Sequence, residues 1–198
     1  MVGWSWRDRR LPRYPNHSPT MTNQQQIFDA IPHRDPFLFV DEIVRWDENE
    51  IVCKKMFSGK EFFFAGHYPH YPLTPGVILC EAAMQVGAIF LSKFFKETHD
   101  VSESIVESEY RRSVPVDGRM NDVKFRQMVH PGDEVLMQVT LTEQMQDVFF
   151  MKAKVTTSGK IAVTFNFACK MVLEATDVTT TFPAQADSAN QSSSRKSC

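Results

Sequence analysis

Two ionisable side chains in the middle of the chain have types and positions that suit acid–base chemistry. Glu81 lies inside Val77–Leu91, a run that is otherwise apolar apart from Gln85. A helix that is apolar on every side is expected to be buried, and a buried carboxylate costs several kcal/mol unless it is paired or protonated. Such a group is retained for an ion pair, a structural hydrogen bond or catalysis.

His67 lies just ahead of this run, in a segment with little conformational freedom. Gly66 precedes it, and prolines follow at positions 69, 72 and 75, which excludes a helix or a central strand there. A positioned imidazole near a desolvated carboxyl forms an acid–base pair whose pKa values the site can separate. The residues alone leave a second interpretation open, in which Glu81 and Gln85 only hydrogen-bond to neighbouring backbone or lie at a subunit contact.

The start of the predicted helix supplies a third chemical element. Thr74 is a suitable N-cap, and Pro75 suits the first helical position. The free N–H groups that follow, at Gly76 and Val77, form an electropositive end that suits a developing oxyanion. A base, an acid and an oxyanion donor together fit abstraction of a proton next to a carbonyl, followed by loss of a β-hydroxyl group.

The elements that position these groups follow from the periodicity of the apolar residues. A short helical turn is predicted over 26–30, one long helix over 77–95, and a loop or short strand over the charged stretch 97–119. Alternation with a period of two, clearest over 135–141, indicates half-buried antiparallel strands. Strands are predicted at 37–44, 51–57, 123–129, 135–144, 148–157 and 161–173. The order is a hairpin, one helix and a meander, which predicts an α+β fold with one antiparallel sheet wrapped around one long buried helix.

Length and composition set the limits of the folded part. The chain has 198 residues, of which 42% are hydrophobic, enough for one domain with its own core. We predict a disordered N-terminal extension at 1–25, a single domain at 26–175 and a disordered C-terminal tail at 176–198, because both ends are polar. A second methionine at position 21 leaves open whether translation starts at Met1 or Met21.

Charge and cysteine usage narrow the class of protein. The formal net charge is −2, which gives no basic face for nucleic acid. Cys53, Cys80 and Cys169 lie in apolar runs, and none of the four cysteines forms a CxxC pair. We therefore expect buried, reduced thiols in a cytoplasmic protein. No membrane span is expected, because the longest apolar run is short and contains Glu81.

Three blocks of the sequence carry a family resemblance that covers about residues 27–173. Residues 31–41 read IPHRDPFLFVD; residues 63–85 contain FFAGHYP, PGV and EAAMQ; and residues 123–133 contain VKFR and PGD. These blocks resemble the FabZ-type (3R)-hydroxyacyl-acyl carrier protein dehydratases of the hotdog superfamily, the middle block without a gap. Where that family often has Gly-His, this chain has His70-Tyr71, so the pocket shape is expected to differ.

The resemblance implies a single hotdog domain that dehydrates 3-hydroxyacyl thioesters carried on acyl carrier protein, without a metal or another cofactor. It implies that His67 is the catalytic base, that Glu81 is the catalytic acid, and that the Gly76 amide polarises the thioester carbonyl. It also implies a homodimer in which each active site takes its histidine from one chain and its glutamate from the other; trimers of such dimers occur in the family. Further candidates for the pocket are Tyr68, Tyr71 and Gln85.

Two other functions remain open. A hotdog thioesterase would use Glu81 to activate water against the same thioester, and a non-catalytic partner subunit would keep the fold without turnover. Among the remaining histidines, His33 is predicted to be a structural hydrogen-bonder, and His70 a residue of the loop or pocket rim. A zinc site built from His67, His70 and Cys80 lacks the rest of a ligand set, so no metal site is predicted.

Overall fold

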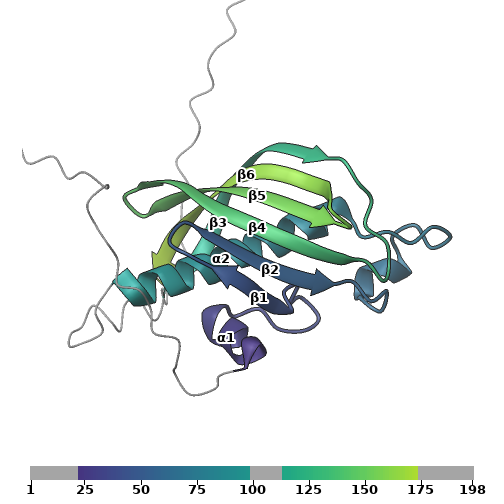
Figure 1. Cartoon of the computed structure of the whole chain (residues 1–198), viewed down its shortest axis with the longest axis horizontal. Helices are drawn as coiled ribbons and strands as arrows, with labels where there is room; N and C mark the ends of the chain where they lie inside the picture. Colours follow the sequence, from purple (N-terminus) through teal and green to yellow (C-terminus); the bar gives the residue numbers. More distant parts are fainter. Residues whose placement is uncertain (1–21, 99–112, 174–198) are drawn as a thin grey trace, which may run out of the picture.

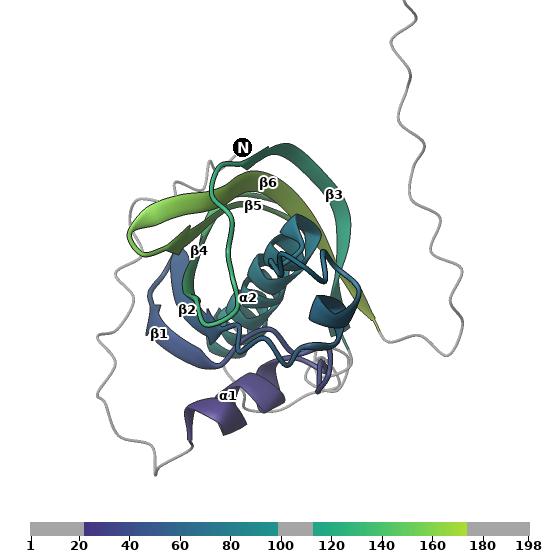
Figure 2. The same cartoon turned by 90° about the vertical axis from the view of Figure 1, so that its right-hand side faces the viewer.

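The computed structural model describes residues 22–98 and 113–173. In this part of the chain a six-stranded sheet curves around one long helix, α2 (Gly76–Thr98), as the end-on view in Figure 2 shows. The strands are β1 (Glu42–Trp46), β2 (Glu50–Met56), β3 (Ser113–Phe125), β4 (Glu134–Met145), β5 (Val148–Thr157) and β6 (Lys160–Leu173). The predicted α+β fold, with one antiparallel sheet wrapped around one buried helix, is confirmed.

All neighbouring strands of the sheet run antiparallel, in the order β1-β2-β4-β5-β6-β3 (Figure 1). The hairpin of β1 and β2 joins the β4–β6 meander through the pairing of β2 with β4. β3 follows α2 in the chain but lies at the far edge, beside β6. The sheet therefore has β1 and β3 as its two edge strands, and α2 crosses its concave face between them.

The core lies between α2 and the concave face of the sheet. Side chains alternate along β4, where Val135, Met137 and Val139 are fully buried. Gly87 allows α2 to approach β6 closely, because a Cβ at this position would lie 2.7 Å from Cζ of Phe167. By length and composition alone α2 is apolar enough to cross a membrane, but most of this stretch is buried inside the protein, as expected for the core helix of a single domain.

The N-terminal helix α1 (Asn23–Ala30) begins before the boundary that the sequence indicated. Thr22 is its N-cap, and the Thr22 side chain accepts a hydrogen bond from the Gln25 amide. The helical turn predicted at 26–30 therefore starts three residues too late, because a capping threonine extends the helix toward the N-terminus. The other predictions for the termini concern residues 1–21 and 174–198, which lie outside the described residues.

Two strands differ from their predicted limits. β1 begins at Glu42 rather than at 37, because the backbone of Phe37 and Phe39 bonds to the Gln85 side chain instead of to a strand. β3 covers Ser113–Phe125 rather than 123–129. Its pairing with β6 is broken by two register shifts, and such bulges obscure the two-residue period on which the prediction relied.

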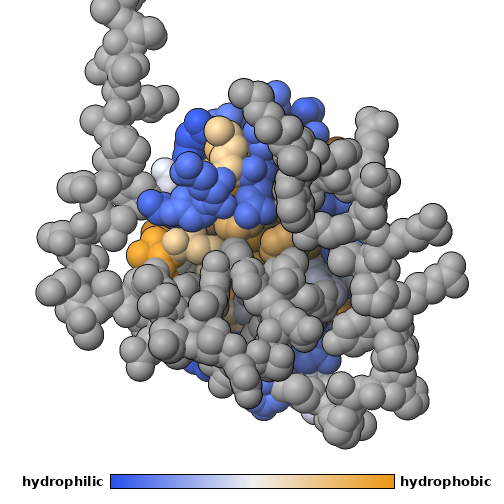
Figure 3. All heavy atoms as spheres, turned by 90° about the vertical axis from the view of Figure 1, so that its left-hand side faces the viewer, coloured by the Kyte–Doolittle hydropathy of each residue, from blue (hydrophilic) through white to orange (hydrophobic). Residues whose placement is uncertain are grey.

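At one end of the molecule, the surface formed by the described residues is mainly polar (Figure 3). Figure 3, which views the left-hand end of Figure 1, shows hydrophilic side chains gathered above a narrower hydrophobic band. Several large apolar side chains are nevertheless exposed elsewhere, among them Val77 at the start of α2 and Met120 and Phe125 on the edge strand β3.

Candidate active site

Glu81 lies in the second turn of α2 and is held by Gln85, one turn further along the helix. Gln85 is 1% exposed, and its Nε2 donates to Glu81 Oε1 over 3.0 Å and to the Phe37 carbonyl over 2.9 Å. The Gln85 Oε1 accepts the Phe39 amide over 2.8 Å. Because a carbonyl only accepts and an amide N–H only donates, these partners fix the orientation of the Gln85 amide. Oε1 of Glu81 is therefore an acceptor.

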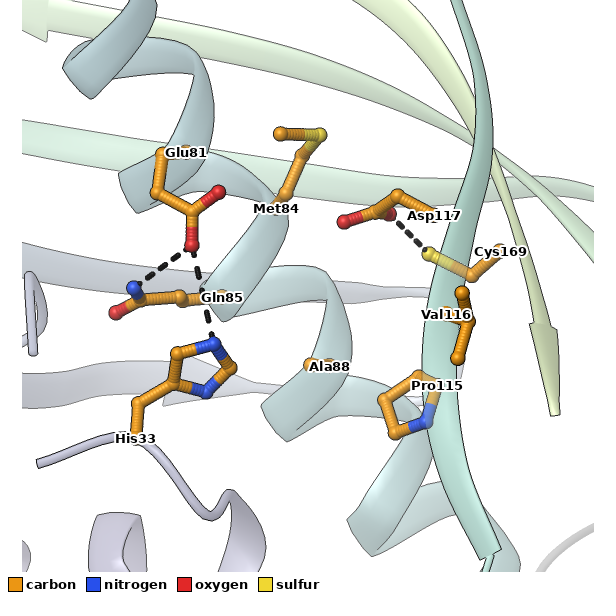
Figure 4. Close-up of a pocket in the computed structure, with 9 residues that line it drawn as sticks. All are labelled: His33, Glu81, Met84, Gln85, Ala88, Pro115, Val116, Asp117 and Cys169. Atoms are coloured by element: carbon orange, nitrogen blue, oxygen red, sulfur yellow. Dashed lines mark hydrogen bonds and ion pairs between the residues drawn. The ribbon is translucent and has the colours of Figure 1, made fainter. Parts of the chain in front are cut away.

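The other carboxyl oxygen of Glu81 has no such constraint. Among residues 22–98 and 113–173, no hydrogen bond to Oε2 of Glu81 is formed. Figure 4 shows Oε1 contacted from one side while the second oxygen points away from Gln85. If the carboxyl carries a proton, that proton is expected on Oε2, because Oε1 already accepts a hydrogen bond from Gln85. The group is thus arranged to donate a proton into the space beside α2.

His33 faces Glu81 from the loop that follows α1. Its Nε2 lies 3.8 Å from Glu81 Oε1, whereas its Nδ1 is buried without a hydrogen-bond partner in the described part of the chain. The prediction that His33 is a structural hydrogen-bonder is therefore wrong. Arg34 has that role instead, since its guanidinium donates to the carbonyls of Phe28, Ile31 and His33 at the end of α1. This anchor fixes the loop so that the His33 ring faces α2.

His67 follows the short 3-10 helix η2 (Phe62–Ala65) and is half-buried. Its amide donates to the Phe63 carbonyl, and its ring Nδ1 lies 3.0 Å from the Leu73 carbonyl. Because a carbonyl cannot donate, Nδ1 carries the hydrogen, and in the neutral ring Nε2 holds the lone pair. The proline-rich loop therefore fixes both the position and the tautomer of an imidazole that can act as a base through Nε2.

The start of α2 differs in detail from the prediction. Thr74 does not cap the helix, since its buried hydroxyl has no partner among the described residues and its amide donates to Val129. The Pro75 carbonyl instead accepts the first bonds of the helix. In the described residues the amides of Gly76 and Val77 bond to no backbone carbonyl, as expected for the first positions of a helix. These two amides are free to bind an oxyanion.

A cavity of about 260 Å³ opens beside Glu81, between α2 and the edge strand β3 (Figure 4). Glu81 and Gln85 line it from the helix, His33 from the loop, and Asp117 from β3. Apolar and thiol groups complete the wall: Met84, Ala88, Pro115, Val116 and Cys169. The cavity therefore combines an acid, a histidine and a second carboxyl with an apolar lining.

Asp117 is the residue of this cavity that sequence reasoning missed. Its Oδ1 accepts a hydrogen bond from the buried Cys169 thiol over 2.8 Å. Although Asp117 as a residue is exposed, withdrawal of its carboxyl from solvent raises its pKa, and the charge of Glu81 raises it further. The Cys169 thiol and His33 act in the opposite direction without cancelling the rise. The sequence signal that could have revealed Asp117 is an acidic residue at the end of the otherwise apolar, strand-like stretch 114–117.

Within one chain, the predicted site residues fall into two groups. Glu81 and Gln85 line the cavity, whereas the cavity lining does not include the remaining candidates: His67, Tyr68, Tyr71, Gly76 and Val77. Tyr68 and Tyr71 are 62% and 55% exposed, and the Tyr71 ring packs against His130. The predicted pairing of His67 with Glu81 across two chains remains a prediction.

The described cysteines are buried thiols, and the described acidic side chains form no metal-binding cluster. Cys53, Cys80 and Cys169 are free and buried, which confirms the prediction made for these three; Cys198 lies outside the described residues. Burial raises the pKa of Cys53 to about 12 and that of Cys80 to about 11. Within 22–98 and 113–173, no group of three or more His, Cys, Asp or Glu side chains is suitably placed to hold a metal ion.

The sheet wrapped around one helix, with a carboxyl-bearing cavity beside that helix, defines a hotdog-type protein. Residues 31–166 match the model of the FabA-like domain. A 3-hydroxyacyl-[acyl-carrier-protein] dehydratase FabZ from Clostridium perfringens is 34% identical over 142 residues, covering 72% of this chain and 93% of the relative. The same enzyme from Streptococcus pyogenes is 34% identical over 152 residues, covering 75% and 99%. This chain belongs to the FabA-like family, and the predicted FabZ-type resemblance is confirmed.

A solved structure agrees with the fold. A chain of the dehydratase heterocomplex ApeI:P from Xenorhabdus doucetiae superimposes with a TM-score of 0.58 at 14% sequence identity, covering 74% of this chain and 90% of the other. At this identity the match supports the fold and carries no information on the residues of the site.

Proposed function

We propose that this chain catalyses the dehydration of (3R)-hydroxyacyl thioesters on acyl carrier protein to trans-2-enoyl thioesters, in fatty-acid or related lipid biosynthesis. The curated relatives are named for this reaction. The observation that carries the proposal is the orientation of Glu81, whose Oε1 is held by Gln85 while Oε2 is left to the cavity. A carboxyl arranged in this way can deliver a proton to a leaving hydroxyl group.

The proposed reaction uses the two groups in sequence. His67 Nε2 takes the proton from C2 of the acyl chain, while the amides of Gly76 and Val77 stabilise the negative charge on the thioester oxygen. The C2–C3 double bond then forms as the C3–O bond breaks, and Glu81 donates its proton, directly or through a water molecule, to the departing hydroxyl. Water leaves, and exchange with solvent returns the proton from His67 to Glu81. No group is oxidised or reduced.

We further propose a homodimer in which each active site takes His67 from one chain and Glu81 from the other. Support comes from β3, an edge strand of 13 residues with exposed Met120 and Phe125. A long edge strand with apolar side chains is a surface that natural proteins cover or pair. Pairing of β3 with β3 of a second copy about a two-fold axis would cover this edge and bring another chain next to the cavity.

The catalytic roles are tested by a dehydration assay on 3-hydroxyacyl carrier thioesters of several lengths, with wild type beside His67→Ala and Glu81→Gln. Each substitution is expected to lower turnover at least about a hundredfold, as for loss of a general acid or base. Near-normal rates in both variants would refute the assignment. Release of free thiol without enoyl product would favour the thioesterase instead, and no product of either kind from wild type would favour a non-catalytic partner subunit.

The two-chain site is tested by mixing the two inactive variants. In a heterodimer of His67→Ala and Glu81→Gln chains, one of the two sites combines an intact histidine with an intact glutamate. Random pairing of equal amounts makes half of the dimers mixed, so about a quarter of wild-type activity is expected. If both residues act within one chain, every site lacks one of them and mixing restores nothing.

Localisation follows from the thiols. We propose that the chain works in the cytoplasm, because Cys53, Cys80 and Cys169 are buried and free, and unpaired buried cysteines are typical of a reducing compartment.

A further inference from the structure

A second carboxyl in the active-site cavity has no role in the reaction described so far. Asp117 lines the same cavity as Glu81, from the opposite element: Glu81 projects from α2 and Asp117 from the edge strand β3 (Figure 4). The two groups are close enough for the charge of Glu81 to affect Asp117. The two carboxyls therefore line the cavity from two different elements.

The backbone around Asp117 is shaped to direct this residue. The register between β3 and β6 shifts between Asp117 and Arg119, so Gly118 is an extra residue in the strand. Bulges of this kind re-aim a neighbouring side chain and are common beside active sites. Pro115 and Val116 precede Asp117 and contribute apolar wall to the same cavity. Asp117 is thus the polar residue among the three that β3 contributes to the cavity wall.

Only one oxygen of Asp117 is engaged within the described residues. Oδ1 accepts the Cys169 thiol over 2.8 Å, and Cys169 is 2% exposed. Burial and the adjacent carboxyl raise the pKa of this thiol, so it remains a protonated donor at neutral pH. Cys169 therefore orients Asp117 from behind, and Oδ2 is left as an acceptor toward the cavity.

We propose that Asp117 is a substrate-positioning residue that accepts the hydrogen of the 3-hydroxyl group, while Glu81 donates a proton to the oxygen of the same group. A hydroxyl has one hydrogen to donate and two lone pairs that accept, so it can bridge one carboxyl that accepts and one that donates. Among the described residues, Oδ2 of Asp117 and Oε2 of Glu81 accept no hydrogen bond, so both are available for this bridge. The inference rests on the proposed function, since it assigns the cavity to the 3-hydroxyl end of that substrate.

The arrangement predicts discrimination between ligands that differ only in this hydroxyl. A hydrogen bond to a charged acceptor contributes more than one between neutral groups. A saturated acyl thioester has no hydroxyl for Asp117, and burying its methylene beside an unpaired carboxyl is unfavourable. Asp117 should therefore favour the 3-hydroxyacyl ligand over the saturated ligand of equal length.

The test measures equilibrium binding of both ligands, as pantetheine thioesters, to the full chain with His67→Ala, in which turnover is expected to be blocked. Asp117→Asn in this background should reduce the preference for the 3-hydroxyacyl ligand about tenfold, through weaker binding of the 3-hydroxyacyl ligand and slightly tighter binding of the saturated ligand, which no longer lies beside an unpaired charge. Cys169→Ala, which leaves Asp117 in place but removes its donor, should reduce the preference by a smaller factor. In a chain with His67 intact, Asp117→Asn should raise KM more than it lowers kcat.

The matched control is Asp122→Asn, the same substitution on the same strand outside the cavity. Asp122 has a positive φ of 55°, which asparagine tolerates well, and its carboxyl binds Asn166 rather than the cavity. This control should keep the full preference. An unchanged preference in Asp117→Asn, or equal weakening of both ligands, would overturn the positioning role. Failure of wild type to dehydrate any 3-hydroxyacyl thioester would instead refute the proposed function, and the binding comparison reports on Asp117 in either case.

Discussion

Substitution of Gln85 by leucine should lower both stability and turnover, by amounts that the structure allows us to estimate. The Gln85 side chain makes three hydrogen bonds, to the Phe39 amide, the Phe37 carbonyl and Glu81. Phe39 is 1% exposed, so its amide would stay buried without a partner, whereas Phe37 is 45% exposed and its surroundings admit water. One buried unpaired N–H costs about 1–3 kcal/mol.

We therefore expect the free energy of unfolding to fall by about 2 kcal/mol in Gln85→Leu. This corresponds to a decrease in Tm of roughly 4–8 °C for a chain of this size. The measurement is urea unfolding followed by circular dichroism, at one fixed protein concentration because assembly would shift the apparent stability. Loss of the bond to Oε1 also frees the Glu81 carboxyl to rotate, so kcat should fall about tenfold with a smaller change in KM.

Gln25→Leu is the matched control, because Gln25 is exposed on α1 and bonds only to exposed groups there. Its effect on the free energy of unfolding should stay within about 0.5 kcal/mol. The reasoning would be refuted if Gln85→Leu matched this control in stability, or if it kept the wild-type kcat. The first result would mean that the Phe39 amide finds another partner, and the second that Glu81 needs no anchor.

Three further predictions concern single groups. In Gly76→Ala the new Cβ would lie 2.6 Å from Cε1 of Phe125. The helix start would be displaced, so kcat should fall at least about tenfold. Adding Phe125→Ala to Gly76→Ala should restore part of the lost kcat. Burial alone opposes ionisation of Glu61, but its hydrogen bonds outweigh burial and lower its pKa. Its contribution to stability is therefore present above its unfolded pKa and lost as pH falls through the folded value. The stability difference between wild type and Glu61→Gln should stay constant from pH 7 to about pH 5 and shrink as the pH falls below the unfolded pKa of about 4.3, as followed by urea unfolding. Because the pKa of Cys53 is raised to about 12 and that of Cys80 to about 11, iodoacetamide at pH 8 should modify both at least about a hundredfold more slowly in the folded chain than in urea, as measured by mass spectrometry.

The parts of the fold that the sequence predicted well are those with an undisturbed hydrophobic period. β4, β5 and β6 were predicted within a residue or two, because each alternates between the core and the outer face. The long helix was equally clear, since an apolar run of that length must be buried. The hairpin of β1 and β2 followed from a turn signal between two apolar runs, although β1 itself starts later than its composition suggested.

The parts that were missed depend on contacts between distant segments. Nothing local to Phe37 and Phe39 reveals that Gln85, more than forty residues away, bonds to their backbone. Asp117 was hidden because its strand is interrupted by bulges and lies in a charged stretch. His33 appeared structural because a histidine between proline and arginine is commonly a loop residue; only the packing of that loop against α2 brings its ring to Glu81.

The separation of His67 from the cavity is itself an argument for a site built by two chains. The two catalytic candidates are only fourteen positions apart in the sequence, which suggests a shared site within one chain. The fold opposes this, because His67 is tied to the Leu73 carbonyl before the helix starts, whereas Glu81 lies five residues beyond Gly76, about 7.5 Å further along the axis of α2. Gln85 holds Glu81 on the side of α2 that faces β3, and the ring of His33 lies 3.8 Å from the same carboxyl. A base fixed at the helix start and an acid fixed beside the sheet edge can serve one substrate if a second copy brings its own helix start to that edge. The same edge strand carries Asp117. Pairing of two β3 strands would therefore both bring His67 of the second copy to Glu81 and cover the Asp117 carboxyl within the completed site.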